Sequence, residues 1–126
     1  MNDCKENTKI QNLISKLEET RKEFWNLPHE SANFINMLIK ISKAKRVLEI
    51  GTSNGYSGIW ISKALQETGG KLDTIEFYQK RIDLAVENFK KADVLDIITI
   101  HQGSALNIID EFEDNTFDFV FIDASK

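Results

Sequence analysis

The sequence predicts an α/β fold in which parallel strands alternate with helices that cover both faces of one sheet. Four short apolar segments each end in turn-forming residues, and segments with a helical repeat of apolar side chains lie between them. The first of these strands runs directly into a glycine turn, Gly51-Thr52-Ser53-Asn54-Gly55, and then into a helix. Open α/β sheets bind nucleotide-like ligands at such strand–turn–helix units.

Two helices are expected before the first strand. In residues 5–25, Ile10, Leu13, Ile14 and Leu17 repeat at i, i+3, i+4 and i+7, which places them on one helical face. Pro28 ends this segment. A second helix is expected over residues 30–42, and its apolar side chains are so broadly distributed that we expect it to pack on more than one side.

The middle of the chain alternates regularly. Residues 46–50 form the first predicted strand and 56–67 the helix after the glycine turn, which ends at Gly69-Gly70. A second strand is predicted at 71–76. Residues 79–92 form the most periodic helix, in which Ile82, Ala85, Val86 and Phe89 share one face.

The last third continues the pattern. We predict a strand at 97–101, a short helix at 104–112 with Ser104 as its N-cap, and a final strand at 117–122. A sheet of this type places its fourth strand near the middle, and the chain stops at Lys126. We therefore expect an unpaired apolar strand edge and interpret the sequence as the front part of a larger domain.

Composition narrows the function classes. A length of 126 residues suits one domain, and 41% hydrophobic content is ordinary for a globular protein. A net charge of −4 disfavours a nucleic-acid binder held by phosphate contacts. Cys4 is the single cysteine, so no internal disulfide is possible. No apolar run reaches membrane-spanning length and the first residues lack a signal peptide, so we expect no membrane association and a cytoplasmic location.

The glycine turn departs from a pyrophosphate site. Dinucleotide enzymes use Gly-x-Gly-x-x-Gly, but Ser53 and Tyr56 occupy the second and third glycine positions here. A bulkier loop suits S-adenosylmethionine, which has no phosphate. This cofactor carries a sulfonium and an ammonium, so a carboxylate such as Glu49 would attract it. An NAD-dependent dehydrogenase is the weaker alternative.

Two further strand ends carry suitable side chains. Glu76 follows Gly51 by 25 residues, close to the spacing of about 20 expected for an acid that binds ribose hydroxyls. Gly103-Ser104-Ala105 follows the third strand, where a turn of small residues can admit the edge of an adenine. Each signal is weak alone, but all three occur in order at the carboxyl ends of strands, where open sheets bind ligands.

Together these motifs resemble the cation-dependent O-methyltransferase family, which includes catechol and caffeoyl-CoA O-methyltransferases. The resemblance rests on residues 47–57, on Thr74-Ile75-Glu76, on residues 119–126, and on Leu27-Pro28-His29-Glu30-Ser31 at the family's active-site entrance. It implies a Rossmann-like class I methyltransferase sheet. It also implies one partial domain over 1–126, with N-terminal helices in 1–45 and the cofactor-binding half in 46–126.

The resemblance also implies roles for individual residues. The methionine part of S-adenosylmethionine would lie among Glu49, Gly51, Ser53 and Ser57; Glu76 would hold the ribose with Phe77 beside the adenine; and Ser104 and Ala105 would contact the adenine ring. Asp123 would lie near the cofactor as the first ligand of a divalent metal, usually Mg²⁺, and Lys126 would be the general base.

The expected function is methyl transfer from S-adenosylmethionine to a hydroxyl of a small catechol-like or phenolic acceptor. In this family the other metal ligands, an Asp-Asn pair, follow the next strand, so we expect this chain alone to be inactive. Family members are commonly dimers, so the resemblance also implies a homodimer for the full-length parent. Two alternatives remain: a tRNA wobble-uridine O-methyltransferase, because relatives act on RNA, and a non-catalytic fragment that binds the cofactor or another chain.

Overall fold

A computed structural model describes residues 2–19 and 28–123. The helices are α1 (Asn2–Glu19), α3 (His29–Ser42), α4 (Tyr56–Thr68), α5 (Gln79–Lys91) and α6 (Ala105–Ile109), with a 3-10 turn, η1 (Leu95–Ile97), after α5. The strands are β1 (Arg46–Ile50), β2 (Lys71–Glu76), β3 (Ile98–Gln102) and β4 (Phe119–Ile122). The predicted alternation of strands and helices is confirmed, with small shifts at element ends.

The four strands form one parallel sheet in the order β3-β2-β1-β4. The chain moves outward from β1 through β2 to β3 and then returns to the other side of β1. The strand order therefore reverses between β1 and β4. In open α/β sheets, ligands bind outside the carboxyl ends of the strands at this reversal.

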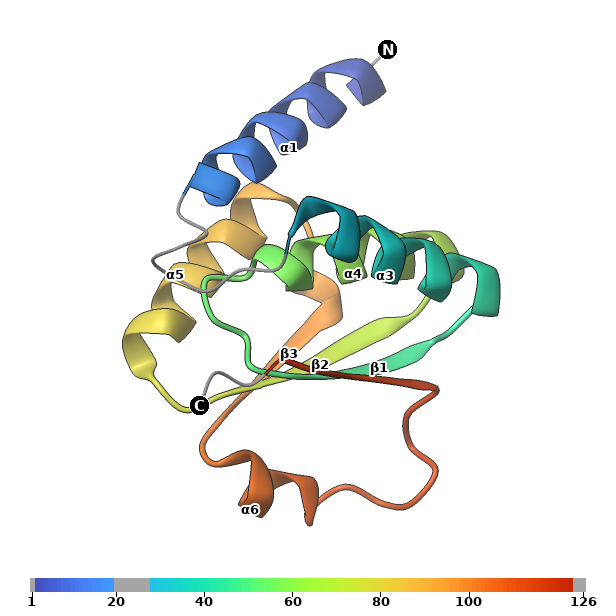
Figure 1. The fold of residues 1–126 in the computed structure, drawn as a ribbon, viewed down its shortest axis with the longest axis vertical. Coiled ribbons are helices and arrows are strands. Elements are labelled where there is room, and N and C mark those ends of the chain that lie inside the picture. Colours follow the sequence, from blue (N-terminus) through green and yellow to red (C-terminus); the bar gives the residue numbers. More distant parts are fainter. Residues whose placement is uncertain (1, 20–27, 124–126) are drawn as a thin grey trace.

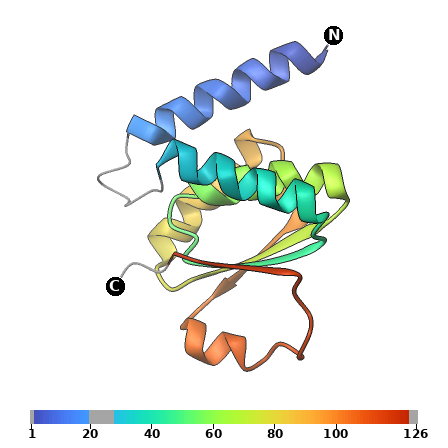
Figure 2. The same ribbon diagram turned by 45° about the vertical axis from the view of Figure 1, so that its right-hand side comes forward.

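The helices form unequal layers on the two faces of the sheet. Figures 1 and 2 show α3, α4 and α5 on one face with α1 lying over them, and α6 with its following loop on the other. The thicker side contains most of the core. Ile61, Ala64 and Leu65 of α4 are fully buried, as the helical repeat predicted, and so is Phe89 of α5. This core fixes α4 and therefore the glycine turn that precedes it.

Helix α1 docks through the face that its repeat predicted. Leu17 is buried in a cluster with Tyr56, Ile59 and Phe89, and the partly buried Leu13 and Ile14 pack against the same cluster. The expected end of this helix near residue 25 lies outside the described residues. Helix α1 thus covers the start of α4 and one side of α5.

Helix α3 differs from its prediction. Ile35 and Ile39 are buried, but Phe34 is 60% exposed and Ile41 is 73% exposed. The expectation that this helix packs on more than one side is therefore wrong for the described residues. A broad apolar surface does not reveal how many neighbours a helix has.

The segment between β3 and β4 also differs. The predicted helix to Phe112 stops at Ile109, and Phe112 instead packs edge-on against His101 and Phe117. The last strand begins at Phe119, and the carboxylate of Asp118 just before it accepts the backbone N–H groups of Lys45 and Arg46. Side-chain contacts across the sheet therefore override the local pattern at both ends of this loop.

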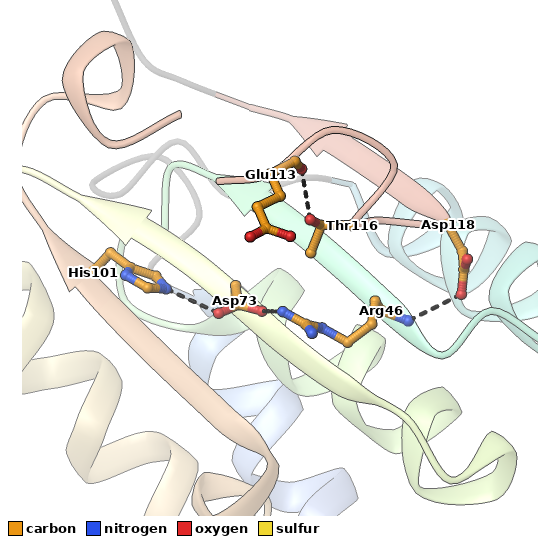
Figure 3. A network of polar contacts seen from close by, with 6 residues as sticks. All are labelled: Arg46, Asp73, His101, Glu113, Thr116 and Asp118. Atoms are coloured by element: carbon orange, nitrogen blue, oxygen red, sulfur yellow. Dashed lines mark hydrogen bonds and ion pairs between the residues drawn. The ribbon is translucent and has the colours of Figure 1, made fainter. Parts of the chain in front are cut away.

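A polar network crosses three strands on the α6 face. Asp73 of β2 accepts a hydrogen bond from the Arg46 guanidinium at 2.9 Å and contacts Nε2 of His101 at 2.9 Å (Figure 3). His101, on β3, therefore has its side-chain partner on the neighbouring strand β2. Nearby, the hydroxyl of Thr116 donates to the backbone carbonyl of Glu113 and closes the turn before β4.

Strand β4 ends the sheet. It pairs with β1, and within residues 2–19 and 28–123 no strand pairs with its other edge. Val120 and Ile122 are 51% and 68% exposed beside the apolar cluster of Leu48, Ile50, Ile75 and Ile108. The unpaired apolar edge that the sequence predicted is therefore present. In the same described ranges, no helix is long and apolar enough to cross a membrane.

Candidate cofactor site

The glycine turn after β1 bends over the end of β2. The backbone N–H groups of Gly51 and Thr52 donate to the carbonyl of Ile75 at 2.9 and 3.2 Å. Gly51 and Gly55 have φ values of 102° and 92°, which glycine adopts freely. Ser53 has a φ of 52°, a left-handed conformation that is uncommon for a residue with a Cβ atom. The turn therefore needs support at Ser53.

Glu76 provides that support. One carboxylate oxygen accepts the N–H of Ser53 at 2.8 Å, and the other accepts the N–H groups of Phe77 and Tyr78 at 3.1 and 3.2 Å. A carboxylate offers about four lone-pair positions, so it can accept a further hydroxyl. The residue predicted to bind ribose is thus also the residue that holds the glycine turn.

Glu49 lies fully buried beneath the turn. The hydroxyl of Thr74 donates to one of its oxygens at 2.7 Å, and the hydroxyl of Ser57 donates to the other. Burial raises the pKa of Glu49 to about 7, the two hydroxyl hydrogen bonds oppose this, and the charges of Asp123 and Glu76 add to it. Near neutral pH this carboxyl group therefore changes charge easily.

Asp123 follows β4 beside the end of β1. Its N–H donates to the carbonyl of Ile50 at 3.0 Å, and burial raises the pKa of its carboxyl group. Among the described residues, no group of three or more His, Cys, Asp and Glu side chains could hold a metal ion. Asp123 as a metal ligand stays a prediction, and the predicted base Lys126 lies outside the described residues.

The predicted adenine contacts lie at the neighbouring strand ends. Phe77, directly after β2, is 62% exposed, and its ring meets that of Tyr78 edge-on at 5.2 Å. Ser104 and Ala105 follow β3 at the start of α6, and Gly103 before them donates its N–H to the carbonyl of Glu76 at 3.0 Å. Ser104 occupies the predicted N-cap position, although its side chain makes no capping hydrogen bond.

The structure brings all the predicted cofactor residues to one edge of the sheet. They sit at the ends of β1, β2, β3 and β4 and at the start of α4, around the point where strand order reverses. In Figures 1 and 2 the β1–α4 turn and the end of β4 lie at the same side of the sheet. This placement is consistent with their predicted roles, which stay predictions residue by residue.

The sequence did not predict the supporting roles of several polar residues around the turn. Thr52 and Thr74 are buried, and their hydroxyls lie 2.7 Å apart in the chain of hydrogen bonds that ends at Glu49. The amide of Asn88 donates to the carbonyl of Asn54 at 2.8 Å and ties the turn to α5. A polar residue in an apolar strand, such as Thr74, and one on the buried side of a periodic helix, such as Asn88, were the available signals.

Comparison with known proteins agrees with this geometry. The profile of the O-methyltransferase family matches residues 3–126. The caffeoyl-CoA O-methyltransferase 1 of Eucalyptus globulus is 36% identical over 116 residues, which cover 86% of this chain and 47% of that protein. The catechol O-methyltransferase of Niastella koreensis is 35% identical over 96 residues, covering 74% of this chain and 43% of that protein.

Solved structures of O-methyltransferases are also similar to this chain. The O-methyltransferase TomG from Streptomyces achromogenes, in complex with SAM, superposes with a TM-score of 0.80 at 32% identity, over 90% of this chain and 54% of that one. The O-methyltransferase from Bacillus cereus, in complex with SAH, superposes with a TM-score of 0.79 at 30% identity, over 94% of this chain and 55% of that one.

The chain thus spans about half the length of the relatives that it matches. The four-stranded parallel sheet is the Rossmann-like methyltransferase sheet that the sequence predicted, over the part of the fold that these residues cover. On its sequence and its fold, the chain belongs to the O-methyltransferase family.

Proposed function

We propose that this chain forms the S-adenosylmethionine-binding part of an O-methyltransferase that acts on a hydroxyl of a small phenolic or catechol-like acceptor. The observation that carries the proposal is the placement of Glu49, Glu76 and Asp123 around one glycine turn at the reversal of strand order. Three carboxylates favour a cationic ligand and disfavour a pyrophosphate.

The turn itself supports a ligand without phosphates. Phosphate sites at helix N-termini expose backbone N–H groups to the ligand. Here the N–H of Ser53 is already bonded to Glu76, and that of Tyr56 to the side-chain oxygen of Asn54. The exposed ring of Phe77 beside Glu76 gives an adenine an apolar surface next to the acceptor for its ribose.

The chemistry assigns different tasks to these residues. S-adenosylmethionine supplies an electrophilic methyl group when bound. The residues of this chain bind and orient it: the charge of Glu49 attracts its cationic end, Glu76 accepts a ribose hydroxyl, and Asp123 adds negative charge at the end of β4. Orientation of two reactants contributes a large share of the rate of such a displacement.

Metal chemistry does not follow from these residues. Mg²⁺ takes six oxygen ligands, whereas the carboxylate of Asp123 can provide two at most. Asp123 therefore does not by itself account for a magnesium site. Magnesium dependence, the homodimer and the acceptor therefore stay predictions from the resemblance. The relatives named above are caffeoyl-CoA and catechol O-methyltransferases, which is the support for a phenolic or catechol-like acceptor.

A second candidate is a chain that binds the cofactor without turnover. The observation that favours it is the role of the contacts themselves, because those of Glu49 and Glu76 account for binding of the cofactor and not for transfer of its methyl group. The tRNA alternative has no comparable support, since the net charge is −4.

Titration calorimetry with S-adenosylmethionine and NAD tests the proposal. We expect S-adenosylmethionine to bind and NAD not to bind; the reverse result would refute the proposal. A methyl-transfer assay with Mg²⁺ and a catechol acceptor then separates the two candidates. Binding with turnover supports the transferase, and binding without turnover supports the cofactor-binding chain.

A further inference from the structure

Glu18, near the end of α1, joins three helices through one carboxylate oxygen. The hydroxyl of Tyr56 donates to Oε2 at 2.5 Å, and Nδ1 of His29 lies 2.6 Å from the same oxygen. Tyr56 is the first residue of α4 and His29 the first residue of α3. The ring of His29 also meets Trp60 of α4 edge-on at 5.1 Å.

Tyr56 connects this junction to the cofactor turn. Its side chain is 1% exposed and points to Glu18, while its backbone N–H donates to the side-chain oxygen of Asn54 inside the turn at 3.2 Å. The next residue, Ser57, donates its hydroxyl to Glu49. The orientation of the first turn of α4 therefore determines the positions of the Asn54 and Ser57 side chains.

The charges suit this contact. The pKa of Tyr56 is held above its ordinary value by burial and by the hydrogen bond to Glu18, so its hydroxyl remains a donor. The pKa of Glu18 lies below its ordinary value, because the hydrogen bonds from Tyr56 and His29 outweigh the effect of burial. A phenol donating to an ionised carboxylate makes a charge-assisted hydrogen bond, which is stronger than a neutral one.

We propose that Glu18 is a positioning residue for the cofactor site: by fixing Tyr56 it holds the start of α4 in the orientation in which Asn54 closes the glycine turn and Ser57 bonds to Glu49. This inference rests on the proposed function. The role proposed for Glu18 differs from docking of the helix, because Leu17 already docks α1 in the apolar cluster. Helix α1 thereby becomes part of the cofactor site without contacting the cofactor.

The role separates from mere stabilisation by what is measured. Substitution of a residue that only stabilises the fold lowers the melting temperature, but at temperatures well below melting it leaves the affinity for the cofactor unchanged. A positioning residue changes the affinity itself. Because coupling between two sites is reciprocal, cofactor binding should also slow hydrogen exchange in α1.

The test uses calorimetry with S-adenosylhomocysteine on the full chain. Tyr56→Phe removes only the donor oxygen, and Glu18→Leu removes the acceptor at similar volume. Glu19→Leu is the matched control, because Glu19 is the exposed neighbour in the same helix. We expect each of the first two variants to bind about five-fold more weakly, the double variant to bind no more weakly than either, and the control to bind normally.

Hydrogen exchange gives the second readout. In the wild-type chain, S-adenosylhomocysteine should slow exchange of α1 amides, and in Tyr56→Phe this protection should be reduced. Unchanged affinity and unchanged protection in Tyr56→Phe, even with a lower melting temperature, would overturn the inference and leave the proposed function intact. Failure of the wild-type chain to bind would refute the proposed function and this inference together. If Glu18→Leu does not fold, Tyr56→Phe decides.

Discussion

The hydroxyl of Ser57 donates a hydrogen bond to the buried carboxylate of Glu49, and so links the first turn of α4 to the middle of the sheet. Glu49 has a pKa of about 7, raised chiefly by burial. A cationic ligand near this carboxylate would favour its ionised form and lower that pKa. Several measurable consequences depend on this one group.

Cofactor binding should release a proton near neutral pH. Because the bound cation lowers the pKa of Glu49, affinity should rise as pH increases through about 7 and level off above it. Calorimetry at pH 7 in two buffers of different ionisation enthalpy measures the released fraction. Glu49→Gln should release no proton from this site and should lose most of the pH dependence. An equal release in the variant would assign the proton to another group.

The same group should make stability depend on pH in the opposite direction. In the folded state the pKa of Glu49, about 7, lies above the ordinary glutamate value of 4.5, so the folded state holds this proton more tightly than the unfolded state. The resulting stabilisation is fully present below pH 4.5 and is lost as pH rises through about 7, a change on the order of 3 kcal/mol.

Urea unfolding of the wild type and of Glu49→Gln from pH 5 to pH 8 measures this change. Subtracting the two curves cancels the carboxyl groups common to both, such as Asp118, whose pKa is lowered by the N–H groups of Lys45 and Arg46. The stability difference should move in favour of Glu49→Gln as pH rises. A difference that is flat with pH would contradict the raised pKa.

Glu76→Gln should weaken both the turn and cofactor binding. In the wild type, both carboxylate oxygens of Glu76 accept backbone N–H groups. In the variant only the amide oxygen can accept, and the NH₂ group would face N–H donors. We expect a loss of about 1–3 kcal/mol in stability and about ten-fold or more in affinity for S-adenosylmethionine. Glu87→Gln is the control, because Glu87 is exposed on α5 and pairs with Lys91 one turn away. Normal affinity in Glu76→Gln would exclude Glu76 from the ribose site.

Periodicity predicted the strands, the helices and their buried faces because burial repeats with the geometry of each element, as Ile61, Ala64 and Leu65 illustrate. It could not predict the contact between Glu18 and Tyr56, which are 38 residues apart, because nothing in the sequence distinguishes Glu18 from the other charged residues of α1. It likewise overestimated the packing of α3, since Phe34 and Ile41 are apolar but exposed. Local pattern shows which face of a helix is apolar, and the neighbours decide which part is covered.

Asp73→Asn should destabilise the sheet and leave the cofactor site intact. Asp73 is the shared partner of Arg46 and His101, and its side chain is 10% exposed. Because the Arg46 side chain is 44% exposed, solvent screens the pair and the expected loss is about 1–2 kcal/mol. Thermal unfolding measures the loss, and calorimetry should give normal affinity for S-adenosylmethionine. Asp83→Asn, on the surface of α5, is the control. Reduced affinity in Asp73→Asn would show that the network reaches the cofactor turn.

Gly55→Ala should be more destabilising than Gly69→Ala, although both glycines have a positive φ. Gly55 has a φ of 92° and Gly69 a φ of 80°, so both substitutions strain the backbone by a similar amount, about 1 kcal/mol. A Cβ atom at Gly55 would lie 2.9 Å from Cε1 of Phe89, whereas one at Gly69 has nothing within 4 Å.

Since Phe89 is fully buried and cannot move freely, the additional cost at Gly55 should be about 1–3 kcal/mol. Urea unfolding of the two variants measures this difference directly, with the shared backbone strain cancelling. Gly55→Ala should also weaken cofactor binding, because it displaces the turn from α5, and Gly69→Ala should not. Equal stability of the two variants would mean that α5 can shift to accommodate the new methyl group, and that the turn is less rigidly held than its contact with Phe89 indicates.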